Sequence, residues 1–268
     1  MLPRPRRAAS SDRVTANLPE TPFPGHWRHI ALGDVASTNS EAMQRALDGD
    51  PGGLWITAQR QMQGRGRRGR PWASEAGNLY ASLLLVDPAP VERIGTLPLV
   101  AALAVYNALR PLFAAVPQAL AIKWPNDVLI DGAKVNGILL ESTALPTGQL
   151  AVVIGCGINC THHPGNPLYP ATDLKACGFD IPPERMFPAL AASCARELER
   201  WDRGRGFGLI REDWLRAARG LGQPIRINMA DRVLEGRFAD LDSRGYLLLE
   251  DASGSITPVS AGDLFFNS

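Results

Sequence analysis

The sequence is short of long apolar runs and of net charge, and each shortage excludes a class of protein. No segment approaches the roughly 20 consecutive apolar residues that a bilayer-spanning helix requires, so we expect no membrane association. The formal charge is +1, whereas a protein that coats nucleic acid is usually far more basic. Apolar residues make up 45% and charged residues 21% of the 268 positions, which indicates a globular protein with a core of ordinary size.

Cysteine is also scarce, and its spacing argues against disulfides and metal ligation. The four cysteines form no CxxC pair and are too few for a disulfide scaffold. Cys156 and Cys160 have CxxxC spacing, but no second ligand pair follows, so we predict structural cysteines and no metal site. We expect surface or structural roles for the histidines, which are His26, His29, His162 and His163.

The first 25 residues are rich in arginine and proline and have no apolar core. Because a secretory signal requires such a core, we predict a flexible N-terminal tail over 1–25 and a cytoplasmic protein. The arginine and serine content of this segment leaves a transit peptide open as the alternative.

Hydrophobic periodicity and turn residues predict the elements that follow the tail. Ser37-Thr38-Asn39 offers N-cap side chains for a helix over 41–49. Asp131-Gly132 predicts a hairpin turn between strands over 122–131 and 134–144. This order of elements indicates an α+β domain with a mixed or antiparallel sheet flanked by helices, not a doubly wound parallel sheet. The other expected elements are strands over 26–37, 53–60, 79–86 and 149–160 and helices over 97–112, 186–203 and 208–221.

The chain changes character at Gly222. From there short apolar runs alternate with tight turns such as Ser243-Arg244-Gly245, which predicts a small SH3-like β-barrel. We therefore expect one larger domain over 26–221 and a barrel over 222–268. The sequence leaves open whether the barrel grips a ligand or partner, or only caps the larger domain.

A glycine- and arginine-rich segment, GRGRRG at 64–69, is the first candidate for chemistry. Its glycines allow the backbone to approach a ligand closely, and its arginines supply planar donors suited to phosphate or carboxylate. It lacks the Gly-Lys-Ser/Thr end of a Walker A loop, and Pro71 and Trp72 stand where a Rossmann fingerprint would begin its helix. Taken alone, it equally suits an RNA-binding patch or a solvated basic loop.

The second block, KWPND at 123–127, places charged side chains in a strand where packing favours aliphatic ones. Lys134 lies on the next predicted strand, so Lys123 and Lys134 are expected to face one site about 5 Å apart. Joining a carboxylate to an α-phosphate brings two anions together, and fixed cations lower that barrier. The alternative is a strand end with Asp127 as a turn residue.

The third block, GCGIN at 155–159, ends a predicted buried strand. Gly155 and Gly157 leave room for a flat ligand against the strand end, and the side-chain amide of Asn159 suits adenine. Standing alone, the block is better explained as a strand–turn with an Asx cap.

Together, GRGRRGRPW, NLYASL, KWPND, KVNGIL and GCGIN occur in an order that resembles the catalytic domain of biotin–protein ligases. The resemblance is close from Ile30 to Asn159 and holds in outline beyond. It implies a class II synthetase-like biotin/lipoate ligase fold with a C-terminal SH3-like barrel. The implied reaction turns biotin and ATP, with Mg²⁺, into biotinyl-AMP and pyrophosphate. Biotin would then pass to a lysine of the biotin carboxyl carrier protein of acetyl-CoA carboxylase.

The resemblance also implies residue roles. Catalytic residues would be Lys134, Arg67, Lys123 and Asp127. Biotin contacts would be Ser37, Thr38, Asn39, Gln61, Gly64, Arg65, Gly66, Arg67, Lys134 and Gly137. ATP or adenylate contacts would be Arg65, Arg67, Arg70, Trp72, Asn126, Lys134 and Asn159. One departure is Asn136, where the family usually has a small residue, and its amide needs a partner or solvent.

The sequence favours this interpretation over three rivals. A lipoate ligase or octanoyl transferase shares the fold, but GRGRRG stands where that group has a glycine-run/His motif. A DNA-binding repressor carries a helix-turn-helix domain first, and the segment before His29 is short and proline-rich, so we expect no DNA binding. An RNA-binding module built on GRGRRG would explain neither the net charge of +1 nor the paired lysines Lys123 and Lys134. Dimerisation through strand edges is left open.

Overall fold

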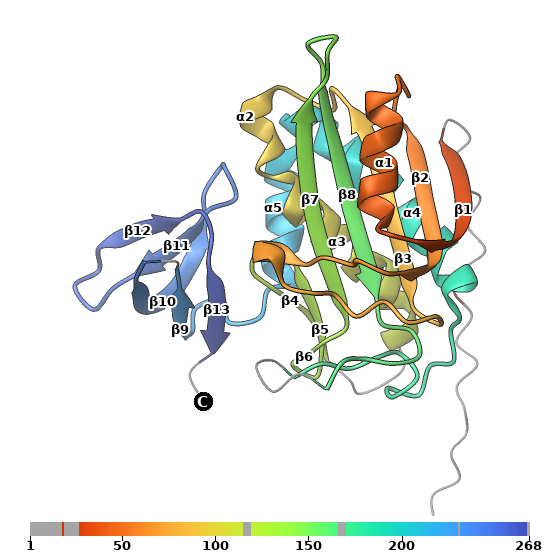
Figure 1. Ribbon diagram of the computed structural model, residues 1–268. Helices are drawn as coiled ribbons and strands as arrows, with labels where there is room; N and C mark the ends of the chain where they lie inside the picture. Colours follow the sequence, from red (N-terminus) through yellow and green to blue (C-terminus); the bar gives the residue numbers. More distant parts are fainter. Residues whose placement is uncertain (1–17, 19–26, 115–118, 166–169, 230, 267–268) are drawn as a thin grey trace, which may run out of the picture.

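The computed structural model describes residues 18, 27–114, 119–165, 170–229 and 231–266. β1 runs parallel to its neighbour β2 and every other neighbouring pair in the central sheet is antiparallel, so the predicted mixed sheet is confirmed (Figure 1). The order across this five-stranded sheet is β1 (Arg28–Val35), β2 (Leu54–Gln61), β3 (Leu79–Val86), β8 (Leu150–Ile158) and β7 (Asn136–Ala144).

Helices cover both faces of the central sheet. The alternation of side chains along β2 separates the two cores, because Ile56 packs with Ala42 of the first helix while Trp55 meets Phe187 edge-on behind the sheet. None of the described helices is both long and apolar enough to cross a membrane. The helices are α1 (Thr38–Leu47) on one face, α3 (Leu97–Leu109) and α4 (Pro183–Trp201) on the other, α5 (Phe207–Arg216) packed on these two, and the short α2 (Val91–Ile94).

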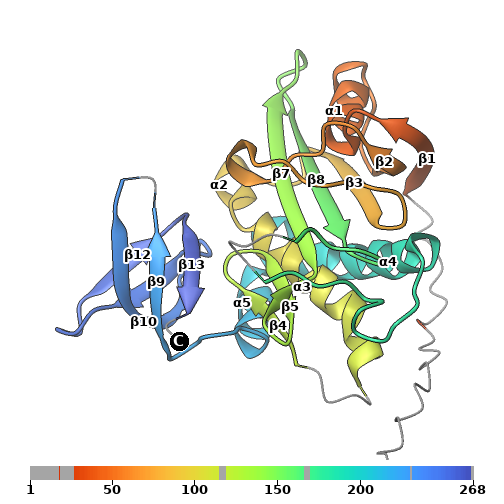
Figure 2. The ribbon, with the colours of Figure 1, turned by 60° about the horizontal axis from the view of Figure 1, so that its bottom comes forward.

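The C-terminal residues form a separate five-stranded antiparallel sheet beside α5, as Figure 2 shows from a second side. Alternate side chains such as Ile225 and Ile227 are buried, and Phe238 packs 6.5 Å, ring to ring, from Trp214 of α5. The predicted all-β C-terminal domain is confirmed, while the boundary at residue 222 stays a prediction. The order of strands is β12 (Ile256–Val259), β11 (Leu247–Glu250), β10 (Val233–Leu241), β9 (Pro224–Asn228) and β13 (Asp263–Phe266).

The segment that was expected to be one strand over 122–131 is a hairpin. The chain reverses through Trp124-Pro125-Asn126, because proline has no N–H to donate to a strand ladder. The Trp124–Pro125 peptide bond in this turn is cis. The predicted turn at Asp131-Gly132 is confirmed, with φ of 48° and 83° as in a type I′ hairpin. A small sheet results, in the order β4 (Leu120–Lys123), β5 (Asp127–Ile130) and β6 (Ala133–Lys134).

Other predicted elements are present with shifted ends. Ser37 is the N-cap of α1 but makes no side-chain cap hydrogen bond. A 3₁₀ turn over Arg110–Phe113 replaces the last turn predicted for α3, and α4 begins at Pro183 rather than Met186. Of the predicted tail over 1–25, the structure describes Leu18 alone, whose side chain is 3% exposed within the main core. The rest of that prediction lies outside the described residues.

Candidate functional site

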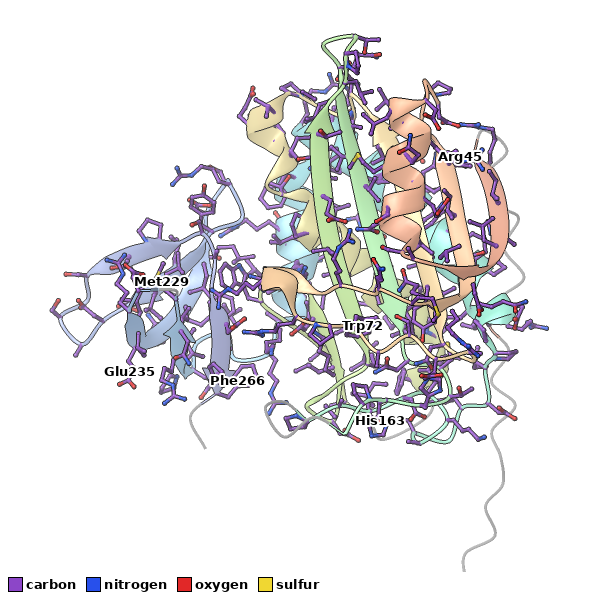
Figure 3. The ribbon with its side chains drawn as sticks, viewed as in Figure 1. Arg45, Trp72, His163, Met229, Glu235 and Phe266 are labelled. Atoms are coloured by element: carbon purple, nitrogen blue, oxygen red, sulfur yellow. The ribbon has the colours of Figure 1, made fainter. Side chains whose placement is uncertain are left out.

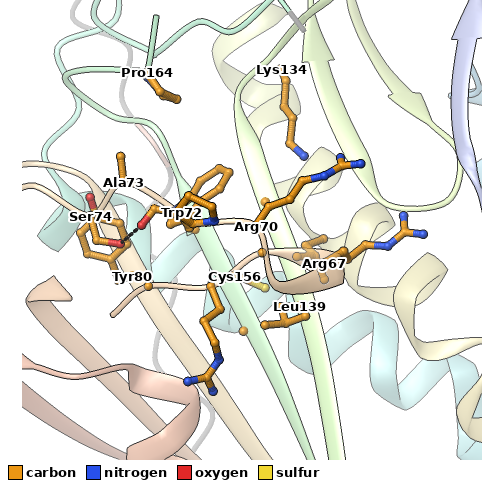
Figure 4. A pocket seen from close by; sticks show the side chains of 18 of the residues that line it. Arg67, Arg70, Trp72, Ala73, Ser74, Tyr80, Lys134, Leu139, Cys156 and Pro164 are labelled. Carbon is orange, nitrogen blue, oxygen red and sulfur yellow. Dashed lines mark hydrogen bonds between the residues drawn. The ribbon is translucent and has the colours of Figure 1, made fainter. Parts of the chain in front are cut away.

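A cavity of about 780 Å³ lies where β7, β8 and the β4–β5–β6 sheet meet the segment 61–75 and the C-terminal sheet. Its size is ordinary for a site that holds a cofactor or small substrate. Every predicted site residue lines the cavity except Asn126. Figure 4 shows part of the lining, including the side chains of Lys134, Arg70 and Trp72. The structure therefore brings the sequence blocks to one place, while the individual roles stay predictions.

The floor of the cavity is a buried hydrogen-bond network. Gln61 Oε1 accepts from the backbone N–H of Thr38 at 2.9 Å and from its hydroxyl at 3.0 Å. Ser82 Oγ lies 2.8 Å from Thr38 Oγ1 and 2.6 Å from Asn39 Oδ1. Ser82 is 0% exposed and was missed by the sequence analysis, since a lone serine in an apolar strand carries no motif. The network continues from Gln61 Nε2 to Ser74 Oγ at 3.0 Å.

The glycines of the third block accommodate side chains of this protein. Gly137 and Gly157 face each other across β7 and β8, and Trp72 covers both, so that a Cβ at either would lie 2.8 Å from the indole. A Cβ at Gly155 would overlap the side-chain amide of Asn39. The interpretation of Gly155 and Gly157 as the bed of a flat ligand therefore needs correction, because Asn39 and Trp72 fill that space in this structure. Figure 3 shows Trp72 at the centre of the larger domain.

The glycine- and arginine-rich segment is a compact loop, closed by backbone bonds from Gly66 N to Arg70 O at 2.7 Å and from Trp72 N to Gly64 O at 2.9 Å. It contains one 3₁₀ turn, Arg67–Gly69. Its arginines contact acceptors on two domains: Arg65 meets Glu141, Arg67 meets the Gly262 carbonyl, and Arg68 and Arg70 meet Asp263.

A lysine–aspartate–lysine cluster faces the loop. Lys123 and Lys134 lie on β4 and β6, so they are not on adjacent strands as expected, and Asp127 of β5 lies between them. Asp127 meets Lys134 Nζ at 2.6 Å and Lys123 Nζ at 3.1 Å. Burial alone would raise the pKa of Asp127, but the two lysines together outweigh burial and lower that pKa. The aspartate thus stays charged and holds both ammonium groups in position.

Three asparagines near the cavity differ in what they contact. Asn126 is buried outside the lining, and its amide donates to the Ile138 carbonyl at 3.1 Å, which argues against the predicted ATP contact. Asn159 lines the cavity, with its amide nitrogen donating to the Thr172 carbonyl at 3.0 Å. Asn136 Oδ1 accepts from Val128 N at 2.6 Å, so the unusual residue joins β5 to β7. Its Nδ2 has no partner among the described residues.

Neither histidine nor cysteine offers a reactive group at the cavity within the described residues. Cys156 lines the cavity, but burial raises the pKa of its thiol to about 12, so it stays protonated. His29 stacks on Phe187 with ring centroids 4.3 Å apart, and His163 pairs with Asp173 at 2.7 Å. His26 lies outside the described residues.

The C-terminal domain contributes part of the cavity wall through Gly262, Asp263 and Leu264. Asp263 Oδ2 lies 2.9 Å from Arg68 Nη1 and 2.6 Å from Arg70 Nη2. Nothing in the sequence signals this contact, because the partners are about 190 positions apart. The C-terminal domain, whose role the sequence left open, therefore touches the loop directly.

Comparison with known proteins gives consistent results along the chain. Residues 33–159 match the biotin/lipoate A/B protein ligase family, and residues 220–266 match the biotin protein ligase C terminal domain. A biotin–[acetyl-CoA-carboxylase] ligase of Paracoccus denitrificans is 39% identical over 88% of this chain and 99% of its own. The bifunctional ligase/repressor BirA of Bacillus subtilis is 33% identical over 85% of this chain and 71% of its own.

A solved structure supports the same relation. The biotin protein ligase of Aquifex aeolicus, in complex with biotin and ATP, superposes with a TM-score of 0.75 at 27% identity. The superposition covers 90% of this chain and 99% of that one.

Proposed function

Because the chain belongs to the biotin/lipoate A/B protein ligase family, we propose that it acts as a biotin–protein ligase. It activates biotin with ATP to biotinyl-AMP and transfers the biotinyl group to a lysine of a carrier protein. The observation that carries this proposal is the meeting of the arginine loop and the Lys123–Asp127–Lys134 cluster in one cavity.

The charged end of the cavity suits adenylate formation. The biotin carboxylate attacks the α-phosphorus of ATP, and negative charge grows on the bridging oxygens as pyrophosphate leaves. Lys134, placed by Asp127, stabilises that charge more strongly in a cavity than it would in water. Mg²⁺ enters with ATP as part of the substrate, and the described residues hold no group of three or more side chains that could ligate a metal.

The loop and the floor suit retention of the product. Biotin lies with its ring end at the Thr38–Asn39–Gln61 floor, and Gly64, Arg65, Gly66 and Arg67 cover the adenylate. Exclusion of water protects the mixed anhydride until the carrier lysine attacks its carbonyl. No enzyme nucleophile takes part, because the acid is activated directly on phosphate.

The acceptor that fits the relatives' names is the biotin carboxyl carrier protein of acetyl-CoA carboxylase. We assign catalysis to residues 26–221 and loop support to residues 222–268. Cytoplasmic location, lack of DNA binding and the oligomeric state stay predictions.

Pyrophosphate release from Mg·ATP tests the proposal. The purified chain is incubated with biotin, lipoate or octanoate and no carrier. Release that requires biotin supports the ligase. Release with lipoate or octanoate alone moves the chain to the sister enzymes of the same fold, and release with none of the three acids contradicts the adenylation reaction.

A further inference from the structure

Glu141 on β7 joins the floor of the cavity to the arginine loop, although it belongs to no sequence motif and lies outside the cavity lining. Its Oε2 accepts from Asn39 Nδ2 at 2.8 Å. Its Oε1 lies 3.3 Å from Arg65 Nη2. Arg65 Nη2 also lies 3.2 Å from the hydroxyl of Ser40, the residue that follows Asn39. One carboxylate therefore contacts the start of α1 and the first arginine of the loop.

The carboxylate fixes which way the Asn39 amide points. A carboxylate only accepts, so the amide nitrogen of Asn39 must face Glu141, and its second hydrogen reaches the Leu139 carbonyl at 3.3 Å. The amide oxygen then faces Ser82 Oγ at 2.6 Å. Asn39 is 5% exposed, so a reversed amide would place its oxygen against the Glu141 carboxylate and the Leu139 carbonyl, and buried acceptors would face each other.

An acceptor-only group also fixes the other end of the network. The Trp72 carbonyl accepts from Ser74 Oγ at 3.0 Å, so Ser74 must in turn accept from Gln61 Nε2. Gln61 Oε1 is then the acceptor for Thr38. The floor is thus tied to the loop at both of its ends, through Glu141 to Arg65 and through Ser74 to Trp72.

From this geometry we propose that Glu141 is a positioning residue that orients Asn39 and holds Arg65 over the cavity before ligand arrives. The proposal rests on the biotin ligase function for its effect on biotin and on the geometry alone for its effect on the loop. Asn39 then supports the floor through bonds within the protein, because both hydrogens of its amide are already donated.

Two substitutions separate the two contacts. Glu141→Gln keeps an oxygen that can accept from Asn39 but removes the charge that attracts Arg65. Glu141→Ala removes both contacts and leaves the longer bond to the Leu139 carbonyl, at 3.3 Å, as the remaining acceptor for the Asn39 amide nitrogen. Asp34→Asn is the matched control, since Asp34 is an exposed carboxylate at the edge of the same sheet, 3.6 Å from Arg60 and outside the cavity lining.

Trypsin reports on the loop without any ligand, because the loop carries three arginines after which trypsin can cleave, Arg65, Arg67 and Arg68, whereas Arg70 precedes Pro71. Mass spectrometry of the fragments measures the rate of cleavage within 65–70. We expect this rate to be about threefold higher in Glu141→Gln, because the substitution removes a partly exposed ion pair with Arg65. We expect about tenfold faster cleavage in Glu141→Ala, where a bond between a charged and a neutral group is also lost. The Asp34→Asn control should match wild type.

Calorimetric titration with biotin alone gives the second readout. The dissociation constant for biotin should rise by the same two factors while that for Mg·ATP changes less than about twofold. Cleavage and biotin affinity that both stay at the wild-type values in Glu141→Ala would overturn the role of Glu141. Equal losses for biotin and Mg·ATP would reduce it to a general structural role. Wild-type protein that binds no biotin would instead refute the ligase function, and the cleavage rates would still decide the role of Glu141 in the loop.

Discussion

The two ends of the cavity are held by different forces. At the floor, Thr38, Asn39 and Ser82 are neutral, no more than 5% exposed, and joined by short hydrogen bonds. At the loop, Arg68 and Arg70 keep 39% and 47% exposure and meet one carboxylate of the C-terminal domain. A buried neutral group that loses its partner costs about 1–3 kcal/mol, whereas an exposed ion pair is worth about 0–1 kcal/mol. The floor is therefore set before a ligand arrives, and the loop can exchange carboxylates for phosphates.

The largest effect is expected for Lys134, whose charge acts on the rate of the chemical step more than on ligand affinity. Lys134→Ala removes the cation closest to Asp127 and should slow biotin-dependent pyrophosphate release by about 10²–10³-fold, as for other contacts that act on developing charge. Biotin affinity, measured separately, should fall by a smaller factor, because the floor that binds the ring end is untouched. Near-normal pyrophosphate release would remove Lys134 from the catalytic residues.

At the floor, Ser82→Ala should have the next largest effect. The substitution leaves Asn39 Oδ1 and Thr38 Oγ1 without the hydroxyl between them, in a site that is 0% exposed. Biotin should bind about tenfold more weakly, equivalent to one buried hydrogen bond. Titration calorimetry against biotin and Mg·ATP gives the measurement. A floor that tolerates this change would contradict the contrast between the two ends.

At the loop, Asp263→Asn should have a smaller effect that depends on salt. Arg68 and Arg70 lose their shared carboxylate, and trypsin should cleave the loop about threefold faster at low ionic strength. Wild-type protein should approach the variant as salt is added, because screening weakens exposed pairs. A difference that persists unchanged in high salt would show that the contact is not mainly electrostatic.

The smallest expected effect is that of moderate acid on the lysine–aspartate cluster. The pKa of Asp127 lies below the ordinary value of 3.8, so its contribution to stability is complete above that value and is lost as pH falls through the lowered pKa. The difference in the free energy of unfolding between Asp127→Asn and wild type should therefore be constant between about pH 5 and 8. A difference that shrinks already near pH 6, in thermal unfolding at several pH values, would mean that the aspartate is not held charged by both lysines.

Local patterns were enough to predict much of the fold. Short apolar runs predicted β2, β3 and β8, and Asp131-Gly132 predicted its turn because that turn requires positive φ. The segment around Pro125 was assigned to a strand, since its apolar neighbours on both sides continue the pattern. The proline itself was the signal that was missed, because it cannot take part in a ladder.

The candidate site was predicted as a set of residue types rather than as contacts. The arginine loop was found because its glycines and arginines suit a phosphate or carboxylate. Lys123, Asp127 and Lys134 were found because charged side chains are unusual in apolar strands. Ser82, Glu141 and Asp263 were missed because each is a common residue whose importance comes from a partner far along the chain. Gly155 and Gly157 were noticed for the wrong reason, since the groups they accommodate are Asn39 and Trp72.

The sequence by itself determined most of the secondary structure, the all-β C-terminal domain and the supply of cations, because these depend on residues close together in the chain. Only the tertiary structure decided which acceptor each arginine meets, which way the Asn39 amide points, and that Asp263 of the second domain reaches the loop. These depend on distances between segments separated by about 100 to 200 positions. Hydrogen bonds and ion pairs require contact within a few ångströms, and packing alone sets those distances.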